Sequence, residues 1–152
     1  MDSELNVLWS AVNGPIDNGP SSGLNIASAV AIDESDSIIM SGNVGTVKYA
    51  PDGNVQWEAP EYGDTLRLDR FGNIFLSKQA ARDDGLYECE IIKLDGKKGT
   101  LRWQTRFHDN SLSDNWPAGL MTDHDGNVYF ASLNGERTTI VKLVEHGRGN
   151  QK

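Results

Sequence analysis

The stretch GLMTDHDGNVYFA occupies residues 119–131 and places an Asp and a tight Gly-Asn turn between two short β-prone runs. Two earlier stretches repeat this pattern: TLRLDRFGNIFLS at 65–77 and AVAIDESDSIIMS at 29–41. Two such runs joined by so short a turn predict a β-hairpin. The sequence therefore predicts three copies of one hairpin, whose strands we name A and B.

A third β-prone run, strand C, follows each hairpin and carries a lysine between two apolar residues. The three runs are Val47-Lys48-Tyr49, Ile92-Lys93-Leu94 and Val141-Lys142-Leu143. Because successive side chains of a strand point to opposite faces, we expect the apolar pair on one face and the lysine on the other. A turn and a fourth run, strand D, come next and carry Trp57 in the first copy and Trp103 in the second. These tryptophans lie about 46 positions apart, an interval typical of propeller blades.

The two ends of the chain contain complementary parts of the repeat. After Gly147 the third copy has no apolar run, whereas residues 7–11 form a D-like run whose Trp9 lies roughly 48 positions before Trp57. The predicted fold is all-β, with three antiparallel propeller blades in the strand order D-ABCD-ABCD-ABC. We expect one repeat domain over 1–147. It divides into an outer strand and loop at 1–28, blades at 29–59 and 60–106, and a blade lacking its outer strand at 107–147, with a tail at 148–152.

Three blades are fewer than the four to eight of typical propellers. A D strand from one end could complete the blade at the other end and remove exposed sheet edges. We therefore expect a homo-oligomer, above all a dimer with a six-bladed ring, or a chain that belongs to a longer propeller.

The repeats resemble the bacterial β-propeller repeats of the SBBP type and the related pyrroloquinoline-quinone-like repeats. The resemblance is carried by DHDGNVY at 123–129 and LDGKKGTLRW at 94–103. The second stretch is similar to the turn and tryptophan that dock neighbouring blades in quinoprotein propellers. Families with such repeats include quinone-dependent dehydrogenases, assembly scaffolds and surface proteins, and no residue of a quinone site corresponds to a position of this chain.

Composition disfavours some classes of partner. The formal net charge of −8 repels phosphate backbones, so we expect no nucleic-acid partner, and the basic residues Lys97, Lys98 and Arg102 are interpreted as solvated. No apolar run approaches the roughly 20 residues of a membrane span. The N-terminus lacks a signal-peptide pattern, which fits a cytoplasmic protein or a piece of a secreted one. The lone Cys89 is interpreted as a small strand hydrophobe.

Loop lengths indicate where a partner could bind. The A–B and C–D turns are short, whereas the D–A and B–C loops share the opposite rim and hold the insertions, including 78–85 and the segment around Trp116. Long loops on a rigid scaffold commonly carry binding sites. The predicted binding residues for a protein or carbohydrate ligand are Asp17, Arg82, Asp83, Asp84, His108, Asp109 and Trp116. Trp116 is expected in a loop outside the repeat, as an apolar anchor.

No cofactor is expected, although Asp123, Asp125 and Asn127 alternate like the start of a calcium loop. The twelfth position of that loop is Asn134 instead of a bidentate Glu, so hairpin-turn chemistry is favoured over weak Ca²⁺ binding.

We find no recognisable catalytic arrangement, and the sequence predicts a non-enzymatic module for binding or scaffolding. Two alternatives stay open. One is a propeller enzyme, such as a quinoprotein, lyase or hydrolase, with a site at the centre of an assembled ring. The other is a structural fragment of a larger propeller.

Overall fold

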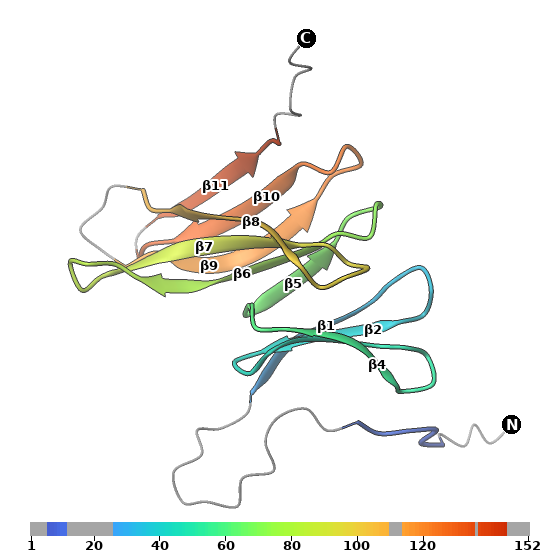
Figure 1. Ribbon diagram of the computed structural model, residues 1–152. Helices are drawn as coiled ribbons and strands as arrows, with labels where there is room; N and C mark the ends of the chain where they lie inside the picture. Colours follow the sequence, from blue (N-terminus) through green and yellow to red (C-terminus); the bar gives the residue numbers. More distant parts are fainter. Residues whose placement is uncertain (1–5, 12–25, 110–113, 136, 146–152) are drawn as a thin grey trace, which may run out of the picture.

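The computed structural model describes residues 6–11, 26–109, 114–135 and 137–145, and within them it contains strands and no helix. The strands form three antiparallel sheets that follow one another along the chain (Figure 1). The first sheet has the order β1 (Ala27–Ile32), β2 (Ile38–Gly42), β3 (Gly45–Tyr49) and β4 (Val55–Ala59). The predicted A, B, C and D strands of the first copy are confirmed.

The second and third copies differ in strand number, as the sequence predicts. The second sheet has the order β5 (Thr65–Leu68), β6 (Ile74–Ala81), β7 (Tyr87–Leu94) and β8 (Leu101–Phe107). The third sheet has three strands in the described part of the chain: β9 (Trp116–Thr122), β10 (Val128–Leu133) and β11 (Thr138–Leu143). Strand β11 is outermost, so its free edge corresponds to the edge of β3 that β4 covers.

One hydrogen-bond pattern builds all three A–B turns. The backbone N–H groups two and four positions after the turn Asp donate to its Oδ1, at 2.8–3.0 Å for Asp33 and 2.9 Å for Asp69 and Asp123. The third residue after each Asp has a positive φ, which Gly72 and Gly126 adopt without a Cβ penalty and Asp36 adopts at φ 58°. The hairpin backbone is therefore the same where Asp36 replaces the expected glycine.

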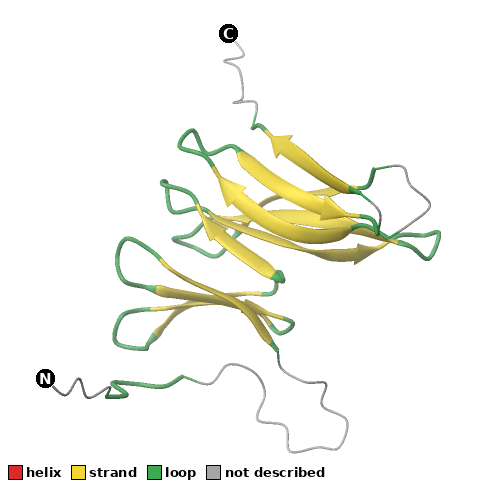
Figure 2. Cartoon of the chain, turned by 180° about the vertical axis from the view of Figure 1, so that it is seen from behind, coloured by secondary structure: helices red, strands yellow, loops and turns green. Residues whose placement is uncertain are grey.

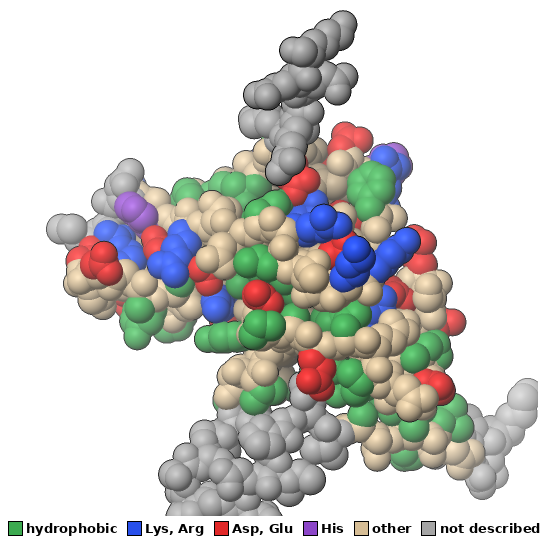
Figure 3. All heavy atoms as spheres, viewed as in Figure 1, with side chains coloured by type: hydrophobic (Ala, Val, Ile, Leu, Met, Phe, Trp, Pro, Cys, Tyr) green, Lys and Arg blue, Asp and Glu red, His purple; other side chains and the backbone are tan. Residues whose placement is uncertain are grey.

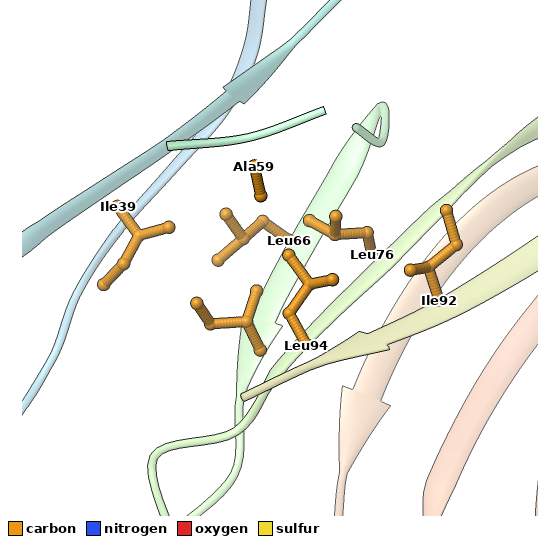
Figure 4. Packing of buried hydrophobic residues seen from close by; sticks show 7 residues of the cluster. Ile39, Ala59, Leu66, Leu76, Ile92 and Leu94 are labelled. Carbon is orange, nitrogen blue, oxygen red and sulfur yellow. The ribbon is translucent and has the colours of Figure 1, made fainter. Parts of the chain in front are cut away.

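Two apolar cores join the sheets in series. The first core lies between sheets one and two and contains Ile39 and Ala59 from the first sheet with five side chains of the second (Figure 4). The second core contains Phe75, Cys89 and Ile91 from the opposite face of the second sheet. They pack against Leu120, Val128 and Phe130 of the third sheet. The middle sheet thus buries both faces. Figure 2 shows the sheets from behind.

The first strands of the three sheets lie next to one another: β1 contacts β5, and β5 contacts β9. The expected alternation in strand C is also confirmed. In β3, Val47 and Tyr49 point away from the second sheet, whereas the buried Lys48 reaches the Gly96 carbonyl in the turn that follows β7.

Three expectations need correction. Residues 78–81 form the end of β6 instead of a loop, because Lys78 to Ala81 pair in register with Glu90 to Tyr87 of β7. Trp116 is the first residue of β9 and pairs with Leu133, so it lies in a strand and not in a loop. Residues 6–11 form no strand, although Trp9 contacts the first sheet. The predicted Asp17, the Gly147 turn and the tail at 148–152 lie outside the described residues.

The surface mixes both signs of charge, and Figure 3 shows basic and acidic side chains side by side over the second and third sheets. The Arg106 guanidinium pairs with Glu88 at 3.1 Å and Glu90 at 2.9 Å, and Lys78 pairs with Glu90 at 3.3 Å. In the described segments, no helix has the length and apolar character needed to cross a membrane.

The second core predicts a large cost for truncating its central ring. Phe75 is fully buried (0% exposed), whereas Phe71, in the adjacent turn, is 60% exposed. Phe75→Ala should lower the free energy of unfolding by about 3–5 kcal/mol, because it removes buried surface and leaves a cavity. The matched Phe71→Ala should cost less than about 1 kcal/mol. Urea denaturation followed by circular dichroism measures both, and equal losses would contradict the described core.

Candidate functional site

The joint between the first two sheets is built around one acceptor. The indole Nε1–H of Trp57 donates to the Gly96 carbonyl at 3.2 Å, and the Lys48 ammonium donates to the same oxygen at 3.1 Å. Lys48 also pairs with Asp33 at 2.6 Å. We call this arrangement the tryptophan latch: an indole of strand D that donates into the C–D turn of the following sheet.

The second joint repeats the latch with a different acceptor. Trp103 Nε1 and Lys93 both donate to Glu145 Oε1, the lysine at 2.7 Å. Glu145 lies two residues after Leu143, as Gly96 lies two residues after Leu94. A carboxylate side chain therefore takes the position of a turn carbonyl and adds an ion pair to the lysine.

A third indole makes the same contact at the start of the chain. Trp9 Nε1 donates to the Pro51 carbonyl at 2.9 Å, and the Trp9 ring lies 6.3 Å from the Tyr49 ring. Pro51 lies two residues after Tyr49, which corresponds to Leu94 and Leu143. Residues 6–11 therefore dock on the first sheet as β4 docks on the second, and Figure 1 shows them beyond the first sheet on the side away from the second.

Two latches need a glycine beneath the indole. Gly53 has φ 87° and Gly99 has φ 68°, a region that other residues adopt only at a cost. A Cβ added at Gly53 would lie 2.9 Å from Trp9 Cδ2, and one at Gly99 would lie 2.5 Å from Trp57 Cε3. The C–D turn is therefore shaped to receive the ring of the preceding tryptophan.

The carboxyl groups at the joints are held ionised. Burial alone would raise the pKa of Glu145, but hydrogen bonds from Lys93 and Trp103 outweigh it, and its pKa lies below the usual value. Burial acts in the same direction on Asp33, and the bonds from Lys48 and two backbone N–H groups again lower its pKa overall.

Asp123 is the hydrogen-bond acceptor of the third A–B turn. Hydrogen bonds from Asn127, Tyr129 and the Asp125 backbone lower its pKa to about 2, the Asn127 side chain having the largest effect. Both carboxylate oxygens thus already accept N–H or O–H groups, as those of Asp69 do in the second copy. Among the described residues, no group of three or more His, Cys, Asp or Glu side chains could hold a metal ion.

The free edge of β11 borders a groove of about 740 Å³. Trp103 and Thr105 of β8 form one side, and Leu143, Val144 and Glu145 at the end of β11 form the other. The groove therefore lies between the D strand of the second sheet and the strand that carries the unpaired edge.

The predicted binding residues that the structure describes gather at one end of the second and third sheets. Arg82, Asp83 and Asp84 form the tight β6–β7 turn, with an Arg82–Asp84 ion pair of 2.7 Å. The neighbouring Tyr87 accepts the Asn115 N–H at 2.9 Å, which brings Trp116 to this end. Asp109 accepts a hydrogen bond from Asn134 in the β10–β11 turn, and His108 precedes it after β8.

A small hollow of about 350 Å³ lies at the same end, lined by residues 81–84, Glu88 and Arg106. Arg82 Nη1 is shielded from water there and has no hydrogen-bond partner among the described residues. The lysines of the latches, Glu145 and Pro51 were not predicted from sequence, although the constant spacing from strand C to the turn could have indicated them.

Cys89 does not supply a nucleophile. Its Sγ donates to Ser132 Oγ at 3.4 Å, and Ser132 donates to Asn115 Oδ1 at 3.1 Å. Burial raises the pKa of the thiol, so it stays protonated at neutral pH. The side chain acts as a packing residue of the second core, as expected.

Comparison with known proteins assigns no family. No protein-family model and no curated protein matches the chain. A crystal structure of a protein of unknown function from Bacteroides caccae is similar over 85% of this chain, with 16% identity and a TM-score of 0.37. The chain spans 62% of the length of that protein.

The latch makes Gly99 more sensitive than another glycine with the same backbone. Gly99→Ala and Gly85→Ala should each cost about 1–2 kcal/mol, because both positions have a positive φ. Nothing lies within 4 Å of a Cβ at Gly85, so only Gly99→Ala should lose a further 1–3 kcal/mol or so from the clash with Trp57. Urea denaturation measures the difference. It should shrink in a Trp57→Ala background, and an unchanged difference there would show that Trp57 is not its source.

The ionised joints also predict acid sensitivity. A carboxyl whose pKa is lower in the folded chain stabilises the fold above the unfolded value, and that contribution is lost as the pH falls through the folded value. Urea midpoints of the protein should therefore fall as the pH is lowered from about 5 to about 2.

Glu145→Gln tests the source of this loss. The variant keeps an oxygen acceptor, and at pH 7 it should cost no more than about 1 kcal/mol, because the Glu145 side chain is half exposed. It should lose less stability on acidification than the wild type, whereas Glu34→Gln in an exposed turn should follow the wild type. Identical acid profiles for all three proteins would rule out a contribution from Glu145.

Proposed function

We propose that this chain is a non-catalytic module of the β-propeller type, in which each sheet is a blade, and that it serves binding or scaffolding. The observation that carries the proposal is the tryptophan latch: three indoles each donate to an acceptor that lies two residues after the end of a strand C. The adjacency of the first strands β1, β5 and β9 supports the same interpretation, as does the resemblance to SBBP-type and pyrroloquinoline-quinone-like repeats. Such a module works by placing rigid blades side by side and presenting its loops.

Assembly through blade edges is supported by the two terminal sheets. The face of the first sheet that points away from the second exposes Val30 at 67% and Ile32 at 63%. The corresponding far face of the third sheet exposes Met121 at 62% and Ile140 at 75%. Contiguous exposed apolar surface and an unpaired strand edge both mark sites where other chains pack.

Partner binding is assigned to the end that carries Arg82, Asp83, Asp84 and Trp116. An exposed tryptophan beside charged groups is typical of interface anchors. The unpaired Arg82 Nη1 favours a ligand with an acceptor oxygen, such as a carbonyl, carboxylate or sugar hydroxyl. A protein segment or a carbohydrate satisfies both requirements.

Solution mass tests the assembly. Light scattering on a sizing column, over a dilution series, should give a mass of two or more whole multiples of the 16.7 kDa chain. Exposed apolar faces and an open edge would then be buried between copies. A well-folded monomer at every concentration contradicts assembly through the blade edges.

A further inference from the structure

Residues 7–11 have the sequence pattern of the two outer strands that the structure describes. The pentads are VQWEA at 55–59, LRWQT at 101–105 and VLWSA at 7–11. Each has an apolar residue two positions before the tryptophan and a small residue two positions after it. The first two pentads lie in β4 and β8 and pair with a C strand, whereas the third lies on no sheet edge.

The register of such a strand on β11 follows from the other two copies. Trp57 lies opposite Lys48, and Trp103 lies opposite Lys93. Two residues further along, Ala59 pairs with Thr46 and Thr105 pairs with Ile91. The equivalent pairs on β11 are Trp9 with Lys142 and Ala11 with Ile140.

From this geometry we propose that residues 6–11 of a second copy bind the free edge of β11 as its fourth strand. The two copies thereby close into one ring of six blades, in which residues 6–11 of each copy complete the third sheet of the other. This inference rests on the proposed propeller-type function and specifies its partner, which is another molecule of the same chain.

The groove beside β11 fits the incoming strand. In β4 and β8, the residue two positions before the tryptophan pairs with the strand-C residue that faces the preceding sheet, as Leu101 pairs with Leu94. Val7 would therefore lie opposite Leu143 and point from β11 toward β8. The groove there is lined by Trp103, Thr105 and Leu143. Val7 is 87% exposed within a single chain, and covering this groove would remove part of its apolar surface from water.

The outward faces of the first and third sheets also correspond to faces that pack together within the chain. Val30 and Ile32 correspond by register to Leu66 and Leu68, which pack against the first sheet in the first core. Ile140 and Lys142 correspond to Ile91 and Lys93, which face the third sheet. The exposed face of the third sheet in one copy therefore resembles, in its apolar residues, the faces that pack between neighbouring sheets in the two cores. It could pack in the same way against the first sheet of the other copy.

The latch at this joint would also be complete. Lys142 occupies the position of Lys48 and Lys93, yet within one chain it lies 3.9 Å from Asp123 and is half exposed. In the paired copies, Lys142 would reach the Pro51 carbonyl of the second copy. That oxygen already accepts the indole N–H of Trp9, as the Gly96 carbonyl accepts both Trp57 and Lys48.

Disulfide trapping between single-cysteine variants tests the pairing. A chain with Ala11→Cys is mixed with a chain carrying Ile140→Cys, and oxidised glutathione is added; the native Cys89 is buried and stays in place. The inference predicts a cross-linked species of two chains on a non-reducing denaturing gel that disappears on reduction. Pairing Ala11→Cys with Met121→Cys is the matched control. Met121 is exposed on the same face but lies two strands from the edge, too far for a disulfide.

The outcomes separate the inference from the function on which it rests. If the wild type is a monomer and the two cysteine variants form no cross-link, edge assembly and the inference are overturned together. If the wild type is an oligomer but the Ala11→Cys and Ile140→Cys variants form no cross-link, the inference alone is overturned. A double variant that cross-links within one chain and keeps the mass of a monomer excludes a second copy as the partner.

A charge at Val7 gives a second, independent readout. Val7→Glu should weaken the dimer at least about tenfold in a light-scattering dilution series, because it would place a carboxylate against Trp103 and Leu143 of the groove. Circular dichroism should be unchanged, since Val7 is exposed in the single chain. Val44→Glu, in the exposed β2–β3 turn, is the matched control and should leave the dimer intact. Equal dimer stability in both variants contradicts the assigned interface.

Discussion

The structure depends on one recurring interaction, the indole N–H of a strand-D tryptophan that donates into the C–D turn of the next sheet. In two joints a strand-C lysine donates to the same acceptor, Gly96 in one and Glu145 in the other. An acceptor bonded to both a ring N–H and an ammonium fixes the angle at which one sheet meets the next. The glycine beneath the ring lets the indole approach the turn backbone closely.

This constraint makes each sheet depend on its neighbours. A four-stranded sheet alone has two faces and two edges to cover, and the second sheet covers both faces because cores lie on either side of it. The first and third sheets each have a neighbour on one side only, and their other faces keep apolar side chains exposed. The latch thus explains both the order within the chain and the surface available for assembly.

The sequence predicts most of the fold, because each repeat is recognisable from patterns of residues that are close together in the chain. Hairpin turns at Asp33, Asp69 and Asp123, alternation in strand C and the repeat-spaced tryptophans all follow from short-range rules. Residues 78–81 were predicted as a loop because nothing local favours a strand there; the ladder to β7 and the Lys78–Glu90 pair impose one. The acceptor Glu145 was not predicted either: the repeat spacing indicates its position, but not that a side chain there replaces a backbone carbonyl across two sheets.

Hydrogen exchange of the indole N–H groups tests the latch most directly. Heteronuclear spectra resolve one signal for each of the four tryptophans. The account predicts that Trp57 and Trp103, whose N–H groups are bonded between sheets, exchange with deuterium more slowly than the exposed Trp116. Equal exchange rates for the three would show that the indoles do not hold the sheets together, and would contradict the account.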